Sequence, residues 1–206
     1  MDKQLLQYLY HKIIPEYRFF DPAHQMDHVE SVIAESLSIA KDYQVNQDMV
    51  YVIACYHDIG MKFGRDDHHL TGGLFLYEDE FLKQYFTEPE RILMKEAIED
   101  HRASRKDEPR SIYGKIIAEA DRDIHPDTVI LRTVLYGLKH FPDLDEHTFV
   151  QRAVDHISEK YGPNGYLKLW LKTDKNTRGM AELAKRLHQK DALEKYILDL
   201  YQKNRK

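Results

Sequence analysis

The sequence predicts an all-α protein, because apolar residues recur with the period of a helix along most of the chain. The clearest case is Val29, Val32, Ile33 and Ala40, which share one helical face. A second observation is that no segment shows the sustained apolar–polar alternation of a strand. A third is a helix-start signal at residues 87–90, Thr-Glu-Pro-Glu, which reads as a capping box with proline in the first turn.

The expected helices follow one another with short connections. The first begins near Asp21-Pro22 and carries the apolar face just described. The second is the buried segment from Met49 to Asp58, for which Gly60 is the expected C-terminal cap. A third starts at Thr87. The remaining predicted helices cover residues 112–121, 129–138, 149–161 and 180–201, and irregular segments are expected at 60–67, 102–110 and 162–176.

The chain is expected to form one domain with a helical extension. We assign residues 1–125 to the core and residues 126–206 to C-terminal helices that pack on the same domain. A chain of 206 residues can bury one sizeable core of this kind. No linker rich in glycine, proline or serine divides it, and no internal repeat is visible.

Composition excludes several classes of protein. Hydrophobic residues make up 42% of the chain, which is typical of a folded protein. The net charge of −5 gives no support to a nucleic-acid-binding surface. No signal peptide or membrane-spanning run is visible, and the single cysteine, Cys55, lies among apolar residues that favour a buried thiol. We therefore expect a cytoplasmic protein without a membrane partner.

Metal-capable residues fall at the expected helix ends and inward faces. The most informative pair is His57-Asp58, at the end of the buried segment, where two polar side chains need a partner. Each site also has an ordinary alternative, because histidines one turn apart are common on solvated helix faces and a histidine at a helix end can act as a cap. The candidates are His24 and His28, His57 and Asp58, His68 and His69, His101, and Asp121.

The order of a histidine, a His-Asp pair and a distant aspartate after an alanine resembles the HD-domain phosphohydrolase superfamily. The matching positions are His28, His57, Asp58 and Asp121. The resemblance covers about residues 21–123 and looks closest to the small bacterial HD-domain hydrolases, whose first motif has two histidines four apart, as in His24 and His28. The chain departs from that subgroup at Gln25 and Ser31, where aspartate and arginine are frequent.

The resemblance implies an HD-domain-like helical bundle with a metal centre. It makes His28, His57, Asp58 and Asp121 the metal ligands. One divalent ion is favoured, chosen from Mn²⁺, Fe²⁺, Co²⁺, Ni²⁺, Zn²⁺ or Mg²⁺. Some members of the superfamily bind a second ion. His69 and His101 lie at suitable places in the chain to bind one, so a second ion is left open here. Catalytic roles are expected for Asp58, His69 and His101, and phosphate contacts for Lys62, Arg65 and Arg102.

The implied function is a metal-dependent phosphohydrolase. A metal-activated water would cleave a phosphoester or phosphoanhydride of a nucleotide or related small molecule. Two alternatives stay open: a di-iron oxygenase, which requires a second metal position, and a non-catalytic regulatory domain that binds a nucleotide. The expected partner is a small phosphorylated substrate and not a nucleic-acid duplex, and a homodimer is left open.

Overall fold

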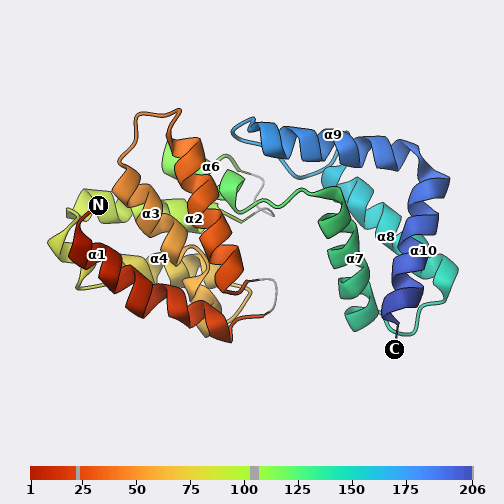
Figure 1. Cartoon of the computed structure of the whole chain (residues 1–206), viewed down its shortest axis with the longest axis horizontal. Coiled ribbons are helices and arrows are strands. Elements are labelled where there is room, and N and C mark those ends of the chain that lie inside the picture. Colours follow the sequence, from red (N-terminus) through yellow and green to blue (C-terminus); the bar gives the residue numbers. More distant parts are fainter. Residues whose placement is uncertain (22–23, 103–106, 206) are drawn as a thin grey trace. The chain divides into compact units, whose positions relative to one another are not determined.

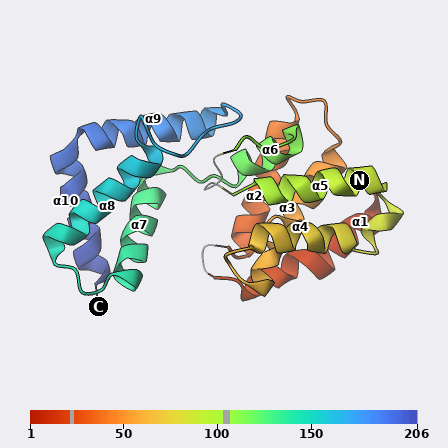
Figure 2. The same cartoon turned by 180° about the vertical axis from the view of Figure 1, so that it is seen from behind.

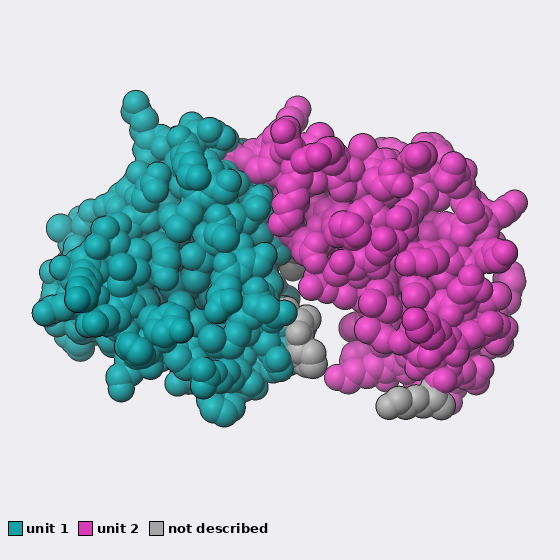
Figure 3. All heavy atoms as spheres, viewed as in Figure 1, with its two compact units in different colours: residues 1–121 teal, residues 122–206 magenta. Residues whose placement is uncertain are grey.

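The computed structural model describes residues 1–21, 24–102 and 107–205. Within these ranges the regular elements are all helices, so the all-α prediction is confirmed. The chain divides into two compact units, residues 1–121 and 122–206, which Figure 3 colours teal and magenta. We describe each unit by itself. The prediction that residues 126–206 pack on the domain formed by residues 1–125 stays a prediction.

The first unit is built around α3 (Gln47–Tyr56), which contacts α2, α4, α5 and α6. Val52, Ala54 and Cys55 are fully buried, as the apolar run predicts, and the Cys55 thiol is free within this core. Figure 1 shows α2 and α3 side by side. The other helices are α1 (Lys3–Tyr8), α2 (Met26–Ala40), α4 (His68–Glu78), α5 (Glu88–Asp100) and α6 (Ile112–Ala120), with π or 3-10 segments at Leu9–Ile13, Ile14–Phe19, Ile59–Phe63 and Leu82–Gln84.

Two helix ends in this unit differ from the sequence prediction. The α2 helix begins at Met26 with Gln25 as its N-cap, several residues later than expected. The α3 helix ends at Tyr56, so Gly60 is not its cap but lies in the 3-10 segment Ile59–Phe63. The early end has a local cause, because the His57 ring donates to the carbonyl of Ala54 at 2.8 Å. In a continuing helix that carbonyl would accept a main-chain N–H.

The second unit consists of four helices that contact one another: α7 (Pro126–His140), α8 (Glu146–Tyr161), α9 (Asp174–His188) and α10 (Lys190–Asn204). The single helix predicted over residues 180–201 is wrong in one respect, because the chain turns at Gln189 between α9 and α10 (Figure 2). Leu183, Leu193, Ile197 and Tyr201 are buried in this unit.

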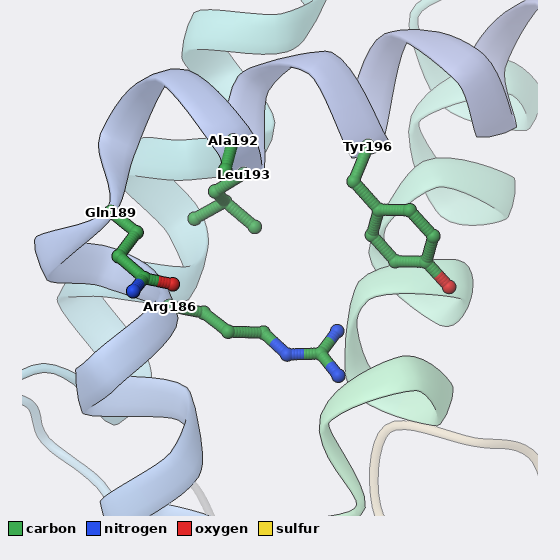
Figure 4. A pocket seen from close by; sticks show the side chains of 5 residues that line it. All are labelled: Arg186, Gln189, Ala192, Leu193 and Tyr196. Atoms are coloured by element: carbon green, nitrogen blue, oxygen red, sulfur yellow. The ribbon is translucent and has the colours of Figure 1, made fainter.

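The capping box at the start of α5 is confirmed, with the Thr87 amide donating to Glu90 at 2.8 Å. Helix α4, which follows the expected irregular segment 60–67, was not predicted. A small hollow lies between α9 and α10 in the second unit; in Figure 4 Arg186 extends beneath it toward Tyr196. None of the described helices is both long and apolar enough to cross a lipid bilayer.

Candidate metal centre

Helix ends converge on the four predicted metal ligands. His28 lies in the first turn of α2, His57 caps the C-terminus of α3, and Asp58 follows it directly. Asp121 caps the C-terminus of α6. Each of these side chains offers one ligand atom, and the four atoms lie within 4.8 Å of one another. Residues separated by almost a hundred positions therefore face one point, as the resemblance implies.

The spacing of these atoms suits a shared ion. His57 Nε2 lies 3.2 Å from His28 Nε2 and 3.2 Å from Asp58 Oδ2, and His28 Nε2 lies 3.3 Å from Asp121 Oδ1. Ligand atoms about 2.1 Å from one ion, at tetrahedral or octahedral angles, are separated by about 3.0–3.4 Å. In addition, Asp58 Oδ2 is buried and has no hydrogen-bond partner among the described residues. The residues therefore fit a divalent ion.

The histidine rings are fixed by bonds to the main chain. Nδ1 of His57 donates to the Ala54 carbonyl at 2.8 Å, and Nδ1 of His101 donates to the Ile98 carbonyl at 2.6 Å. His68 makes the same kind of bond to Arg65 at 2.7 Å. When Nδ1 carries the proton, Nε2 is the free ligand atom. All three rings thus present Nε2 to the carboxylate of Asp58.

A second group of ligand atoms shares Asp58. His68 Nε2 and His101 Nε2 lie 3.3 and 3.5 Å from Asp58 Oδ1, on the carboxylate oxygen opposite the first group. The two ring nitrogens are 3.3 Å apart. His69 was predicted for this position, whereas the structure places its neighbour His68 there. Either histidine has a glycine four residues later, Gly72 or Gly73, so the sequence offers no signal that separates them.

Glycines allow α4 to come close enough to deliver His68. A Cβ on Gly60 would lie 2.0 Å from the His68 carbonyl oxygen and 2.6 Å from the Gly72 amide nitrogen. A Cβ on Gly72 would lie 3.2 Å from the Gly60 nitrogen. The role of Gly60 is therefore close approach between the His57-Asp58 turn and the first turn of α4.

Burial and the neighbouring charges shift the pKa values of the centre in opposite directions. Burial lowers the pKa of His28, but the carboxylates of Asp121 and Asp58 outweigh burial and raise it to about 10. Burial raises the pKa of Asp58, and the neighbouring His57, His101 and His28 reverse this and hold it well below its usual value. The pKa of Asp121 is likewise lowered, chiefly by His28 against the effect of burial. The carboxylates are therefore in the charged form that metal binding needs.

The centre is open on one side. The side chains of His57 and Asp58 are 0% and 3% exposed, whereas those of His28 and Asp121 are 17% and 24% exposed. His68 is 12% exposed. Asp121 and His28 are therefore the more exposed ligands, and the buried His57-Asp58 pair forms the floor of the centre.

The predicted phosphate contacts lie in the first unit, and each already has a protein partner. Lys62 Nζ lies 2.7 Å from Glu16, and Arg65 donates to Asp21 at 2.8 Å. Arg102 donates to the Asp66 carbonyl at 2.5 Å. Asp21 also bonds to His24 at 2.8 Å, and the His24 ring stands 5.5 Å from that of His28, so this pair borders the centre.

His69 does not face Asp58 with the other histidines. Its ring lies 5.7 Å from that of His68, and its Nδ1 is buried with no hydrogen-bond partner among the described residues. Burial, followed by the charge of Arg102, lowers its pKa to about 4. A catalytic role for His69 stays a prediction. Tyr17 was not predicted to belong near the centre, yet its buried hydroxyl contacts the main chain of Asp58.

The chain resembles known proteins in sequence and in fold. Residues 26–124 match the family model of the HD domain. The fold is similar to the crystal structure of a predicted HD superfamily hydrolase from an uncultured Thermotogales bacterium, with a TM-score of 0.50 and 23% identity over 75% of this chain and 84% of that one. No curated protein matches the sequence. The family match spans every residue of both ligand groups.

Proposed function

We propose that this chain, of which residues 26–124 belong to the HD domain family, is a divalent-metal-dependent phosphohydrolase acting on a nucleotide or similar small phosphorylated molecule. At the superfamily level, the domain and its histidine–aspartate cluster support a metal-dependent hydrolase. The observation that carries the proposal is the pair of ligand groups that share Asp58. Imidazole and carboxylate donors of this kind suit first-row divalent ions.

Each residue of the centre has a distinct part in the proposal. Asp58 offers one carboxylate oxygen to each group, with Oδ2 beside His28 and His57 and Oδ1 beside His68 and His101. A divalent ion bound by these residues would supply a bound water of lowered pKa and positive charge for the phosphoryl group. Because His101 Nε2 faces Asp58, we assign His101 to binding a second ion, a role that the sequence left open, and not to a separate catalytic role.

The substrate is expected to enter past Asp121 and His28, the more exposed ligands. Arg102 uses one guanidinium N–H for the Asp66 carbonyl, and a guanidinium has five, so it retains donors for a phosphate. To contact the substrate, Lys62 would have to break its ion pair with Glu16, and Arg65 its ion pair with Asp21. We therefore favour Arg102 as the phosphate contact of the three.

A substrate panel tests the proposal. Metal-stripped protein is reloaded separately with Mn²⁺, Fe²⁺, Co²⁺, Ni²⁺, Zn²⁺ and Mg²⁺. Each form is assayed with nucleoside mono-, di- and triphosphates and with aryl phosphomonoesters and diesters, and phosphate and pyrophosphate are measured separately. We expect hydrolysis with at least one ion. We further expect His57→Ala and Asp58→Ala to fall to the level of the stripped protein.

The matched control is His147→Ala, which removes an exposed histidine from α8 in the second unit. It is expected to keep the wild-type rate. Hydrolysis that survives Asp58→Ala, or a wild-type protein that holds no divalent ion, would contradict the proposal.

A di-iron oxygenase is the second candidate, because the two ligand groups joined by Asp58 offer the two metal positions that it needs. The two functions differ in their use of oxygen. Iron-loaded protein that turns over only with oxygen, and consumes it in proportion to product, would favour the oxygenase. Phosphate release under anaerobic conditions would favour the hydrolase.

A further inference from the structure

Tyr17 comes from outside the segment that matches the HD domain, yet its side chain reaches the His57-Asp58 turn. It lies in the 3-10 segment Ile14–Phe19 and is 0% exposed. Its hydroxyl donates to the Cys55 carbonyl at 3.0 Å and accepts from the Asp58 amide at 3.2 Å. Its ring lies 6.1 Å from that of His57. One buried hydroxyl therefore contacts the main chain on both sides of His57.

The hydroxyl replaces main-chain bonds that α3 gives up at its end. In a continuing α-helix the Asp58 amide would donate to the Ala54 carbonyl, and the Cys55 carbonyl would accept from Ile59. Here the Ala54 carbonyl accepts from the His57 ring instead, and Asp58 has left the helical conformation, with φ −108° and ψ 4°. A buried main-chain group without a hydrogen-bond partner destabilises the folded protein. The Tyr17 hydroxyl serves as the acceptor for the Asp58 amide and as the donor to the Cys55 carbonyl.

We propose that Tyr17 is a positioning residue of the metal centre, which holds the end of α3 in the turn that aims His57 and Asp58 at the same point. The inference rests on the proposed function only in that the centre binds an ion. Adjacent residues of a regular helix project about 100° apart. The turn at Asp58 is what allows both side chains to serve one ion, so the group that stabilises this turn affects metal binding without touching the metal.

The test compares two tyrosine-to-phenylalanine variants of the full chain. Tyr17→Phe removes the hydroxyl at the turn. Tyr56→Phe is the matched control, because Tyr56 is equally buried, lies next to His57 in sequence and donates its hydroxyl to Asp79 at 2.6 Å. Mn²⁺ affinity is measured by titration of metal-stripped protein. The visible absorption of Co²⁺-loaded protein reports ligand geometry directly, and loss of general stability alone does not change it.

We expect Tyr17→Phe to bind Mn²⁺ about 10–100-fold more weakly, the range typical of groups that orient metal ligands, and to shift the Co²⁺ bands. Tyr56→Phe is expected to keep the wild-type affinity and bands while losing thermal stability. Equal effects in the two variants, or unchanged affinity in Tyr17→Phe, would overturn the inference. A wild-type protein that binds no divalent ion would overturn the proposed function as well, and this outcome is seen before any variant is made.

Tyr17→Phe could fail to accumulate as folded protein, and a measurement on the wild type covers that case. Hydrogen exchange of the Asp58 amide is compared with that of the exposed residues 64–67. A hydrogen bond to a buried hydroxyl predicts strong protection of the Asp58 amide. Exchange as fast as in the exposed residues would show that the bond is not formed, and the inference would be wrong.

Discussion

His68 and His69 show at the scale of single residues how closely a neighbour can resemble a ligand. Both are histidines in the first turn of α4, and only His68 brings Nε2 to 3.3 Å from Asp58 Oδ1. When both ligand groups of the wild type are loaded, we expect His68→Ala to hold one ion fewer, because it loses a ligand of the second group. His69→Ala should leave the content unchanged, because its ring faces elsewhere. Metal analysis after dialysis against limiting Mn²⁺ measures both. A loss of one ion in His69→Ala alone would reverse the assignment.

Gly60 provides a second residue-scale prediction. A methyl group at this position meets the His68 carbonyl oxygen at 2.0 Å, so α4 must move away from the turn. We expect Gly60→Ala to lower the free energy of unfolding by about 1–3 kcal/mol, the usual cost of overpacking, and to weaken the ion position that contains His68. Chemical denaturation and metal analysis provide the measurements.

The control for this prediction is Gly73→Ala, on the same helix. Its Cβ would meet the Lys95 carbonyl oxygen at 3.0 Å, which presses α4 against α5 and not against the turn. It is expected to lose stability while keeping its ions. If Gly73→Ala also lost the His68 ion, the effect would follow from a general displacement of α4.

At the scale of elements, the C-terminal end of α5 is stabilised by an ion pair between Asp100 and Arg110. Asp100 is 2% exposed, and the side chain of Arg110 donates to both of its carboxylate oxygens, at 3.0–3.2 Å. The same guanidinium reaches Glu99 at 2.6 Å. Asp100 directly precedes His101, so this ion pair fixes the helix end that presents His101 to Asp58.

Removing the guanidinium leaves the Asp100 carboxylate buried with less compensation. We expect Arg110→Ala to cost about 3 kcal/mol of unfolding free energy. Arg110→Lys should recover only part of the lost unfolding free energy, because an ammonium group cannot form the bidentate contact with the Asp100 carboxylate. Urea denaturation measures the loss. Lys83→Ala, which removes an exposed ion pair with Glu80, is the control and should cost less than about 1 kcal/mol.

Sequence patterns predicted some elements well and others poorly, for physical reasons. The α5 start at Thr87 was predictable because its capping box is local chemistry. The end of α3 was not, because it depends on the His57 ring and on the hydroxyl of Tyr17, forty residues away. Likewise, ligand order along the chain indicated His28, His57, Asp58 and Asp121, whereas the choice of His68 over His69 depends on how α4 packs beside Gly60.

At the scale of the whole molecule, stability at alkaline pH reports on tyrosines buried in both units. In the second unit Tyr161 is 8% exposed, and burial raises its pKa to about 12. An unfolded tyrosine ionises near pH 10. Between these values the unfolded chain loses a proton that the folded protein keeps, so stability falls as the pH rises. The contribution of Tyr161 is complete below pH 10 and is lost as the pH rises toward 12.

Tyr161→Phe removes the ionisable group and keeps the ring. Between pH 10 and 12 the unfolding free energy of the variant should therefore fall less steeply than that of the wild type, by about 1.4 kcal/mol per pH unit. Denaturant titrations at several pH values give both slopes, and below pH 9 the difference between the two proteins should be constant. Equal slopes would mean that Tyr161 titrates in the folded protein as it does in the unfolded chain. In the first unit, burial likewise raises the pKa of Tyr8 to about 12, so the variant retains part of the alkaline loss.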